Sequence, residues 1–512
     1  MSRDEKRGHV YLVGAGPGAL GLVTLRARQL IEQADVIVYD YLCNPEMLRW
    51  ARGDAEKIYV GKSGSYHTIP QEEINAILTS RALAGKEVVR LKGGDPYVFG
   101  RGGEEAQILA RSGIPFEVVP GVTSAIAVPS YAGIPVTHRD FASTVTFVTG
   151  HEDPAKPDSA IDWSWLARLS GTLVFLMGVE RLRQITGRLI AEGADPATPA
   201  ALVRWGTTAH QETLAGTLGT IADLVQERRF SPPAAIVIGD VVKLRSELNW
   251  YEALPLFGKR IVVTRTRGQA GVLAQRLVQL GADVLEIPTI RIVPVPSDAP
   301  MREKLTAFSN HFDWLVFTSP NAVDRFFAEF FQVASDLRDL GTVKIASLGP
   351  ATTAKLQQLH LRVDLQPEIF TAEKLAEALA EKIMPGARIC FPKGRLAATL
   401  VADRLQERGA RVESWILYDT QPEKEDLGGA RLRYQNEGAH FSIFTSSSTV
   451  EYWHAMQLQS EPDTPRPRAV SLGPITSATL RRLGYEIAAE APESTLDSLV
   501  ATMLKLSMES IP

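Results

Sequence analysis

The stretch RLKGGDPYVFGRGGEE, residues 90–105, is the most informative part of the chain. It follows a short apolar run, Glu87 to Leu91, that is typical of a buried strand, and a helix is predicted from Glu104. Five glycines between positions 93 and 103 allow the backbone to approach a ligand closely. Because open α/β sheets bind ligands at the carboxyl ends of their strands, we interpret this stretch as a ligand-binding loop. The alternative is a plain surface turn, which the interleaved charged and aromatic residues disfavour.

Composition and charge exclude several classes of function. The 512 residues are enough for about three or four domains of ordinary size. A net charge of −4 argues against a nucleic-acid partner or a membrane partner that is bound through bulk charge, but it allows a local basic pocket for an acidic small molecule. No apolar run approaches the ~20 residues of a spanning helix. The mixed charges of Met1 to Arg7 are not typical of a signal peptide.

The cysteines and histidines indicate neither a disulfide framework nor a metal site. Cys43 and Cys390 are the only cysteines, and they lie in different predicted domains. A reducing, cytoplasmic setting is therefore expected. The nine histidines are scattered without the spacing of a zinc site, so no metal is expected.

The first 40 residues predict a strand, a glycine-rich loop, a helix and a second strand. Gly16-Pro17-Gly18-Ala19-Leu20-Gly21 matches the pattern G-x-G-x-x-G, and Asp40 lies 19 residues beyond Gly21. By pattern alone this is a dinucleotide-binding fingerprint, so an NAD-dependent oxidoreductase is one hypothesis. Pro17 counts against it, because a phosphate cradle uses backbone N–H groups and proline removes one.

A second α/β region follows the first. Strands are predicted at 143–148, 172–177, 200–204 and 234–238, with helices near 179–192 and 219–226. Strands that alternate with helices favour mostly parallel sheets covered on both faces.

Several motifs of the first half resemble the tetrapyrrole methylase family, and in particular its uroporphyrinogen-III C-methyltransferases. They are, in order, residues 13–18, 38–40, 61–62, 66–71, 90–105, 119–124 and 133–140. The resemblance covers residues 8–250. It implies an α/β fold with lobes at about 8–140 and 141–245, a homodimer formed through this half, and S-adenosyl-L-methionine bound between the lobes, with S-adenosyl-L-homocysteine as the product.

Residue by residue, the resemblance also implies a site. The proton acceptor falls on Asp40 and the proton donor on Lys62. Ala19 departs from the family, which usually has Asp after Gly-Pro-Gly, so this loop lacks the carboxylate that the family carries there. The implied cofactor contacts are Pro17, Gly93, Gly94, Asp95, Val98, Thr123, Ser124, Met177 and Gly206.

The chemistry of methyl transfer agrees with these residue types. Transfer from a sulfonium to a pyrrole carbon is an in-line displacement in which positioning supplies much of the catalysis. The methylated carbon must then lose a proton, which gives a carboxylate such as Asp40 a role as base. The implied substrate carries eight carboxylates, which cations could bind. The candidates are Arg90, Lys92, Arg101 and Arg139, although a solvated surface charge is the favoured interpretation of any one of them taken alone.

The second half contains an internal repeat after a linker at residues 251–256. Phe317-Thr318-Ser319 recurs as Phe444-Thr445-Ser446, 127 positions later. Leu348-Gly349-Pro350-Ala351-Thr352 recurs as Leu472-Gly473-Pro474-Ile475-Thr476, 124 positions later. Two similar α/β lobes with a cleft between them are expected. The turns suit anionic ligands, but Ser and Thr at such positions are as often simple helix caps.

Residues 257–505 resemble uroporphyrinogen-III synthase, on the paired turns and on Tyr418. The usual Thr-Arg-Pro opening is Thr264-Arg265-Thr266 here. The resemblance implies a bilobal α/β fold with lobes at 257–292 plus 421–505 and at 293–420. It makes Tyr418 the candidate acid that assists loss of water from hydroxymethylbilane, whereas the residues alone favour a buried core tyrosine at this position. The implied substrate contacts are Arg265, Ser319, Thr352, Thr445, Ser446 and Thr476.

Together the two resemblances predict a bifunctional enzyme. The C-terminal half would close hydroxymethylbilane to uroporphyrinogen III with inversion of ring D, and the N-terminal half would methylate that product twice to precorrin-2. Precorrin-2 leads to siroheme or cobalamin, and the sequence leaves the destination open. The alternatives are the NAD-dependent oxidoreductase and a methyltransferase whose C-terminal half binds a ligand without turnover. No nucleic-acid or membrane partner is expected.

Overall fold

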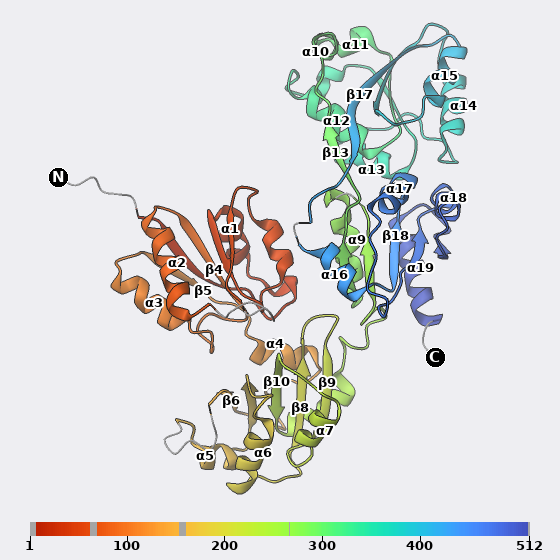
Figure 1. The fold of residues 1–512 in the computed structure, drawn as a ribbon. Coiled ribbons are helices and arrows are strands. Elements are labelled where there is room, and N and C mark those ends of the chain that lie inside the picture. Colours follow the sequence, from red (N-terminus) through yellow and green to blue (C-terminus); the bar gives the residue numbers. More distant parts are fainter. Residues whose placement is uncertain (1–6, 62–68, 153–159, 266, 427, 510–512) are drawn as a thin grey trace, which may run out of the picture.

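The computed structural model describes residues 7–61, 69–152, 160–265, 267–426 and 428–509. These residues form four five-stranded sheets, two in each half of the chain. Figure 1 shows the first sheet in red and orange, the second in orange and yellow, and the two sheets of the C-terminal half in green and blue. No helix among the described residues is long and apolar enough to cross a membrane.

The first sheet is parallel throughout and has the strand order β3-β2-β4-β1-β5. Its central strands are apolar, as the sequence predicts: Val10, Leu12 and Val89 are fully buried. The strands are β1 (His9–Gly14), β2 (Val36–Tyr39), β3 (Glu56–Tyr59), β4 (Glu87–Lys92) and β5 (Phe116–Val119). The helices of this lobe are α1 (Leu25–Gln33), α2 (Gln71–Leu83), α3 (Gly102–Arg111) and α4 (Ser124–Tyr131).

The second sheet is mixed, and the expectation of a mostly parallel sheet is wrong for this lobe. Its order is β6-β7-β10-β8-β9, and only the pair β6–β7 is parallel. Residues 205–211 join β8 to β9, and so short a loop cannot make the crossover that parallel neighbours need. The strands are β6 (Val145–Thr149), β7 (Thr172–Leu176), β8 (Pro199–Arg204), β9 (Glu212–Thr217) and β10 (Ala234–Ile238), and the helices are α5 (Trp163–Arg168), α6 (Leu182–Ala191), α7 (Ile221–Glu227) and α8 (Arg245–Leu248).

The third sheet opens and closes the C-terminal half. It is parallel, with the order β12-β11-β18-β19-β20, so the chain leaves it after β12 and returns at β18. Its strands are β11 (Arg260–Val263), β12 (Asp283–Glu286), β18 (Phe441–Phe444), β19 (Arg468–Ser471) and β20 (Ile487–Glu490). Its helices are α9 (Arg267–Gln279), α16 (Ala430–Glu437), α17 (Ser447–Met456), α18 (Pro474–Arg482) and α19 (Leu496–Glu509).

The fourth sheet is inserted between β12 and β18 and stands above the third in Figure 1. Its order is β13-β17-β16-β14-β15, and its core is an aromatic cluster that includes Phe308, Phe326 and Trp415. Its strands are β13 (Ile290–Pro294), β14 (Trp314–Phe317), β15 (Lys344–Ser347), β16 (Arg388–Gly394) and β17 (Arg411–Pro422). Its helices are α10 (Ala299–Thr306), α11 (Phe308–His311), α12 (Pro320–Phe330), α13 (Pro350–Gln358), α14 (Ala372–Lys382) and α15 (Leu400–Glu407).

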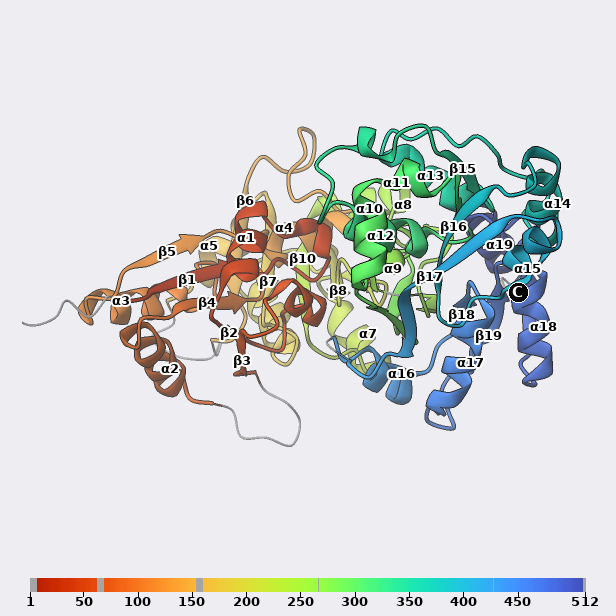
Figure 2. The same ribbon diagram turned by 90° about the horizontal axis from the view of Figure 1, so that it is seen from above.

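Residues 251–256, expected to be a linker, pack against both halves. Tyr251 is buried, with its ring centroid 4.8 Å from that of Tyr131 and 5.4 Å from that of Phe257. Leu256 is fully buried in the core of the third sheet. The two halves are thus joined by a fixed segment, and Figure 2 shows them side by side along the molecule.

Candidate active sites

Three glycine loops meet where β1, β4 and β5 end. Gly16 N–H donates to the Gly94 carbonyl at 3.1 Å, and Gly94 N–H donates to the Gly16 carbonyl at 2.7 Å. A Cβ on Gly14 would lie 2.4 Å from the Cα of Gly121, and one on Gly121 would lie 2.2 Å from the Gly94 oxygen. Side chains have no room here, so the loops pack backbone against backbone and form a continuous floor.

Asp95 holds this floor together. One oxygen of its carboxylate accepts hydrogen bonds from the N–H groups of Tyr97 (2.8 Å) and Val98 (3.2 Å). The other oxygen accepts from the N–H of Gly121 at 3.0 Å. The carboxylate therefore fixes the loop of β4 against the loop of β5, a task that only a short side chain with two acceptors performs.

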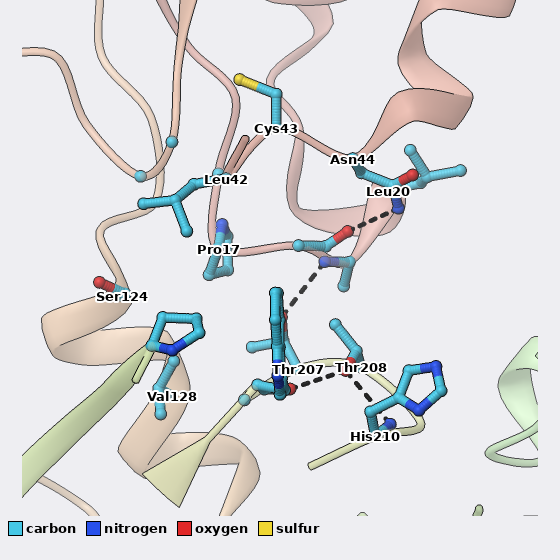
Figure 3. Close-up of a pocket in the computed structure, with 18 of the residues that line it drawn as sticks. Pro17, Leu20, Leu42, Cys43, Asn44, Ser124, Val128, Thr207, Thr208 and His210 are labelled. Atoms are coloured by element: carbon cyan, nitrogen blue, oxygen red, sulfur yellow. Dashed lines mark hydrogen bonds between the residues drawn. The ribbon is translucent and has the colours of Figure 1, made fainter. Parts of the chain in front are cut away.

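A cavity of about 2180 Å³ lies above the floor; it is lined by the two lobes of the N-terminal half and, on a further side, by residues of the C-terminal half. Figure 3 shows Pro17, Leu42 and Asn44 on one side of it and Val128, Thr207 and Thr208 on the other. Ligand sites for small molecules usually measure about 300–1,000 Å³, so this cavity has room for more than one ligand. All nine of the predicted cofactor contacts line it: Pro17, Gly93, Gly94, Asp95, Val98, Thr123, Ser124, Met177 and Gly206.

The backbone at the far wall of the cavity is unusual. Met177 has a φ of 59° and a side chain that is 52% exposed, although it follows a buried strand. A left-handed residue other than glycine is uncommon and concentrates at functional sites. Thr123, by contrast, is buried and caps α4, its hydroxyl accepting from the N–H of Ala125 at 3.3 Å. The second lobe therefore presents the exposed Met177 to the cavity, whereas the hydroxyl of Thr123 in the first lobe serves to cap a helix.

Asp40, at the end of β2, lines the cavity and is supported from below by charged residues. Arg90 lies 3.4 Å from its carboxylate and 3.5 Å from that of Glu105. Lys92 is 2.9 Å from the same Glu105, and these three supporting side chains are at most 5% exposed. Burial, reinforced by the charge of Arg90, lowers the pKa of Lys92 in spite of Glu105. The network fixes the orientation of Asp40 from inside the protein.

A second candidate site lies in the C-terminal half, where β14 and β16 end beside Tyr418 of β17. The hydroxyl of Tyr418 is 3.0 Å from that of Ser319, the residue that caps α12. The ring of Tyr418 packs on Gly394, where an added Cβ would lie 2.6 Å from the ring. Burial raises the pKa of Tyr418, while the hydrogen bonds to Ser319 and to the backbone of Gly394 oppose the rise. Tyr418 thus holds its proton firmly at neutral pH.

The sequence repeat appears as matched turns in the two lobes of this half. Ser319 caps α12 and Ser446 caps α17, each by accepting a hydrogen bond from the third residue beyond it. Ser347 pairs with Thr353 at 2.5 Å in one lobe, and Ser471 pairs with Ser477 at 2.6 Å in the other. The hydroxyls at these strand ends therefore cap helices and hydrogen-bond to one another in both lobes.

Comparisons with known proteins agree with this division of the chain. The family model of tetrapyrrole (corrin/porphyrin) methylases matches residues 9–222, and that of uroporphyrinogen-III synthase HemD matches residues 271–501. The porphyrin biosynthesis protein HemD of Ruminiclostridium josui is 38% identical over 506 residues, which are 98% of this chain and 98% of that protein. The chain belongs to both families, one in each half.

Two further relatives match the methylase half, residues 8–250. The S-adenosyl-L-methionine-dependent uroporphyrinogen III methyltransferase of Methanosarcina barkeri is 56% identical over 242 residues, which are 47% of this chain and 95% of that protein. The crystal structure of the uroporphyrin-III C-methyl transferase of Thermus thermophilus complexed with S-adenyl homocysteine is 42% identical. It covers 46% of this chain and 100% of its own, with a TM-score of 0.40.

The structure places the four candidate substrate cations of the methylase half differently from one another. Lys92 lines the cavity, but Arg90 does not; it is buried beneath it, where Glu105 and Asp40 occupy its guanidinium. Arg101 is exposed and paired with Glu104 at 2.7 Å, and Arg139 is exposed on a turn; neither lines the cavity. Lys62, the expected proton donor, lies outside the described residues.

In the synthase half, residues 257–505, the predicted substrate contacts also differ in how exposed their side chains are. Thr445 and Ser446 are half-buried at the end of β18, and Arg265 is half-buried after β11, where burial lowers its pKa. Thr352 and Thr476 are buried within α13 and α18. Their hydroxyls are therefore packed against neighbouring residues and are less accessible to a substrate carboxylate than the sequence suggests.

The loop at 14–21 does not have the geometry of a dinucleotide cradle. The Gly16 N–H is already bonded to Gly94, and Ala19 N–H donates to the Thr207 hydroxyl at 3.2 Å. A short 3-10 helix at Leu20–Leu22 follows the loop, and the α-helix α1 begins only at Leu25, capped by Thr24, so no α-helix N-terminus follows the loop directly. A pyrophosphate cradle needs both free N–H groups and that terminus. The glycines here allow the close backbone packing that forms the floor of the cavity.

Of the loop at 205–211, which forms one side of the cavity, sequence reasoning named only Gly206. Trp205 and Thr207 have φ values of 47° and 68°. Gln211 holds the loop by accepting from the N–H of Thr207 at 2.9 Å, and the N–H of Ala19 on the opposite side donates to the Thr207 hydroxyl at 3.2 Å. Left-handed residues other than glycine leave no signal in the sequence, so the rest of this loop was not predicted.

Proposed function

We propose that the chain is a bifunctional enzyme that converts hydroxymethylbilane to uroporphyrinogen III and then to precorrin-2. The observation that carries the proposal is the pairing of a tetrapyrrole methylase with a uroporphyrinogen-III synthase on one chain, a pairing that a relative shares over 98% of its length. The product of the synthase reaction is the substrate of the methylation, so the two activities form a sequence.

S-adenosyl-L-methionine fits the cavity of the methylase half, and it would supply the methyl group as a sulfonium. The floor of Gly93 and Gly94 lets a ligand approach the backbone, and Ser124 at the start of α4 offers a hydroxyl beside it. Asp40 would accept the proton that the methylated pyrrole carbon loses, and Arg90 would keep it oriented. Lys62 is the proposed donor, by family resemblance alone.

Tyr418 is the proposed acid of the synthase half. Loss of the hydroxyl group of hydroxymethylbilane as water needs a proton, and a buried phenol with a raised pKa carries one at neutral pH. Ser319 fixes the direction of the phenolic O–H at 3.0 Å. Arg265, Thr445 and Ser446 would bind substrate carboxylates around it.

We also propose that the chain works as a cytoplasmic homodimer. Both cysteines are buried, free and far apart in the chain, as expected in a reducing compartment. Family resemblance supports dimerisation through the methylase half. Light scattering on the purified full chain measures its mass, and a monomer at micromolar concentration would contradict this part of the proposal.

Product analysis of the full chain tests the proposed function. With hydroxymethylbilane and S-adenosyl-L-methionine together, we expect precorrin-2, identified as uroporphyrinogen III plus two methyl groups. With hydroxymethylbilane alone we expect uroporphyrinogen III; the uninverted isomer would show that the synthase half only binds a ligand. Calorimetry with S-adenosyl-L-homocysteine and with NAD distinguishes the remaining alternative, because only the former is expected to bind.

A further inference from the structure

The cavity of the methylase half extends to the synthase half. Residues of α9, β12 and α16 line it together with the glycine loops and the loop at 205–211. On α9 these are Gly271, Val272, Ala274, Gln275, Val278 and Gln279. A volume of about 2180 Å³ exceeds what a nucleoside cofactor needs, so most of the space beside α9 is left for a second, larger ligand.

The helix α9 has two different faces. Leu273 and Leu277 are fully buried in the core of the third sheet. The residues on the other side recur at helical spacing and face the cavity, where Val272 is 61% exposed and Val278 is 51% exposed. A Cβ on Gly271 would meet no atom within 4 Å. This face combines aliphatic side chains, two exposed amides and open space, which suits a ligand that is itself part apolar and part charged.

Ion pairs between the halves hold α9 in this place. Arg49 of the methylase half is 2.9 Å from Glu286 of β12, and both side chains are 19% exposed. His210 is 3.0 Å from Asp283, which also pairs with Arg433 at 2.9 Å. Burial alone would raise the pKa of Asp283, but contact with His210 and the charge of Arg433 lower it below its usual range.

The cluster around Asp283 contains residue types that bind metal ions, but nearby arginines compensate the negative charge that a metal site needs. His210, Asp283 and Glu437 place ligand atoms within 4.8 Å of one another. The guanidinium groups of Arg260 and Arg433 contact both carboxylates, so their negative charge is already neutralised. We therefore interpret the cluster as a junction that fixes the two halves, and it sits at the edge of the cavity.

We propose that α9 of the synthase half is one wall of the tetrapyrrole site of the methylase half, and that Gln275 and Gln279 are substrate-positioning residues in it. The inference rests on the proposed function. A polycarboxylated macrocycle presents apolar ring faces and carboxylate arms. Val272 and Val278 would contact the ring, while the amide N–H groups of Gln275 and Gln279 would donate to carboxylates. The synthase half would thus take part in the second reaction as well as the first.

A charge swap on α9 tests the inference in the full-length enzyme. Gln275→Lys and Gln275→Glu place opposite charges at the wall without entering the buried face of α9. With uroporphyrinogen III as the added substrate, we expect KM to fall about three- to tenfold for the lysine variant and to rise as much for the glutamate variant, with kcat nearly unchanged. Affinity for S-adenosyl-L-homocysteine, measured by calorimetry, should stay constant in both variants.

The matched controls are Gln406→Lys and Gln406→Glu on α15, where the glutamine is exposed and lies outside the cavity. They change net charge equally and should leave KM unchanged. Equal KM values in the two Gln275 variants, or shifts that Gln406 reproduces, would overturn the inference while the proposed function stands. A wild-type chain that does not methylate uroporphyrinogen III would instead overturn the proposed function and this inference with it.

Discussion

The phenolic oxygen of Tyr418 lies 3.0 Å from the hydroxyl oxygen of Ser319, although the two residues are 99 positions apart in the chain. Ser319 also caps α12 by accepting from the N–H of Ala322 at 3.1 Å. Its donor hydrogen is therefore free to rotate toward Tyr418 or toward a ligand, while its own position is fixed by the helix. The pair gives the synthase half one oriented, protonated phenol within β17, opposite the end of β16.

Replacing Tyr418 should separate the two activities of the chain. Tyr418→Phe keeps the ring that packs on Gly394 but removes the proton, so we expect the rate of uroporphyrinogen III formation to fall by about 10²-fold or more. Methylation of added uroporphyrinogen III should be unchanged. Tyr434→Phe is the control, since Tyr434 is a buried tyrosine of the other lobe's core. Loss of both activities in Tyr418→Phe would contradict separate sites.

The ionisation of Tyr418 should contribute to the way the free energy of unfolding changes with pH. Burial raises its pKa in the folded protein, whereas the unfolded chain titrates near the usual value of about 10. Its contribution to the free energy of unfolding is therefore complete below about pH 10 and decreases as the pH rises beyond it. Thermal midpoints between pH 8 and 11 should fall more steeply for wild type than for Tyr418→Phe. Parallel curves would show that the phenol is not perturbed.

Glu105 should be far more important for stability than its neighbour Glu104. Glu105→Gln leaves Lys92 and Arg90 buried without their shared carboxylate, so we expect a loss of about 3–5 kcal/mol in the unfolding of the methylase half. Glu104→Gln breaks a pair with Arg101 whose side chains are more than half exposed, and should cost less than about 1 kcal/mol. Chemical denaturation measures both, and equal losses would contradict the buried network.

The sequence predicted the elements of the fold better than the contacts between them. Apolar runs before glycine loops placed β1, β4 and β5, and the repeat placed the turns at Ser319 and Ser446. The strand β9 was missed because its residues are mostly half-exposed and carry no clear alternation. Arg90 was predicted to bind substrate carboxylates because a pattern does not show which charged residue has a buried partner. The wall formed by α9 depends on the packing of two halves, which no local pattern encodes.

A single methyl group should distinguish the structural glycines of the central loops from the others. Gly121→Ala would place its Cβ 2.2 Å from the carbonyl oxygen of Gly94, so the floor of the cavity must shift. We expect a loss of about 1–3 kcal/mol in stability and at least a tenfold weaker affinity for S-adenosyl-L-homocysteine. Gly103→Ala is the control, because its Cβ would meet no atom within 4 Å and it lies in α3. That variant should be neutral or more stable by up to about 1 kcal/mol, with unchanged affinity. Calorimetry and chemical denaturation measure both quantities, and tight binding by Gly121→Ala would show that the close approach of these loops is not what forms the cofactor site.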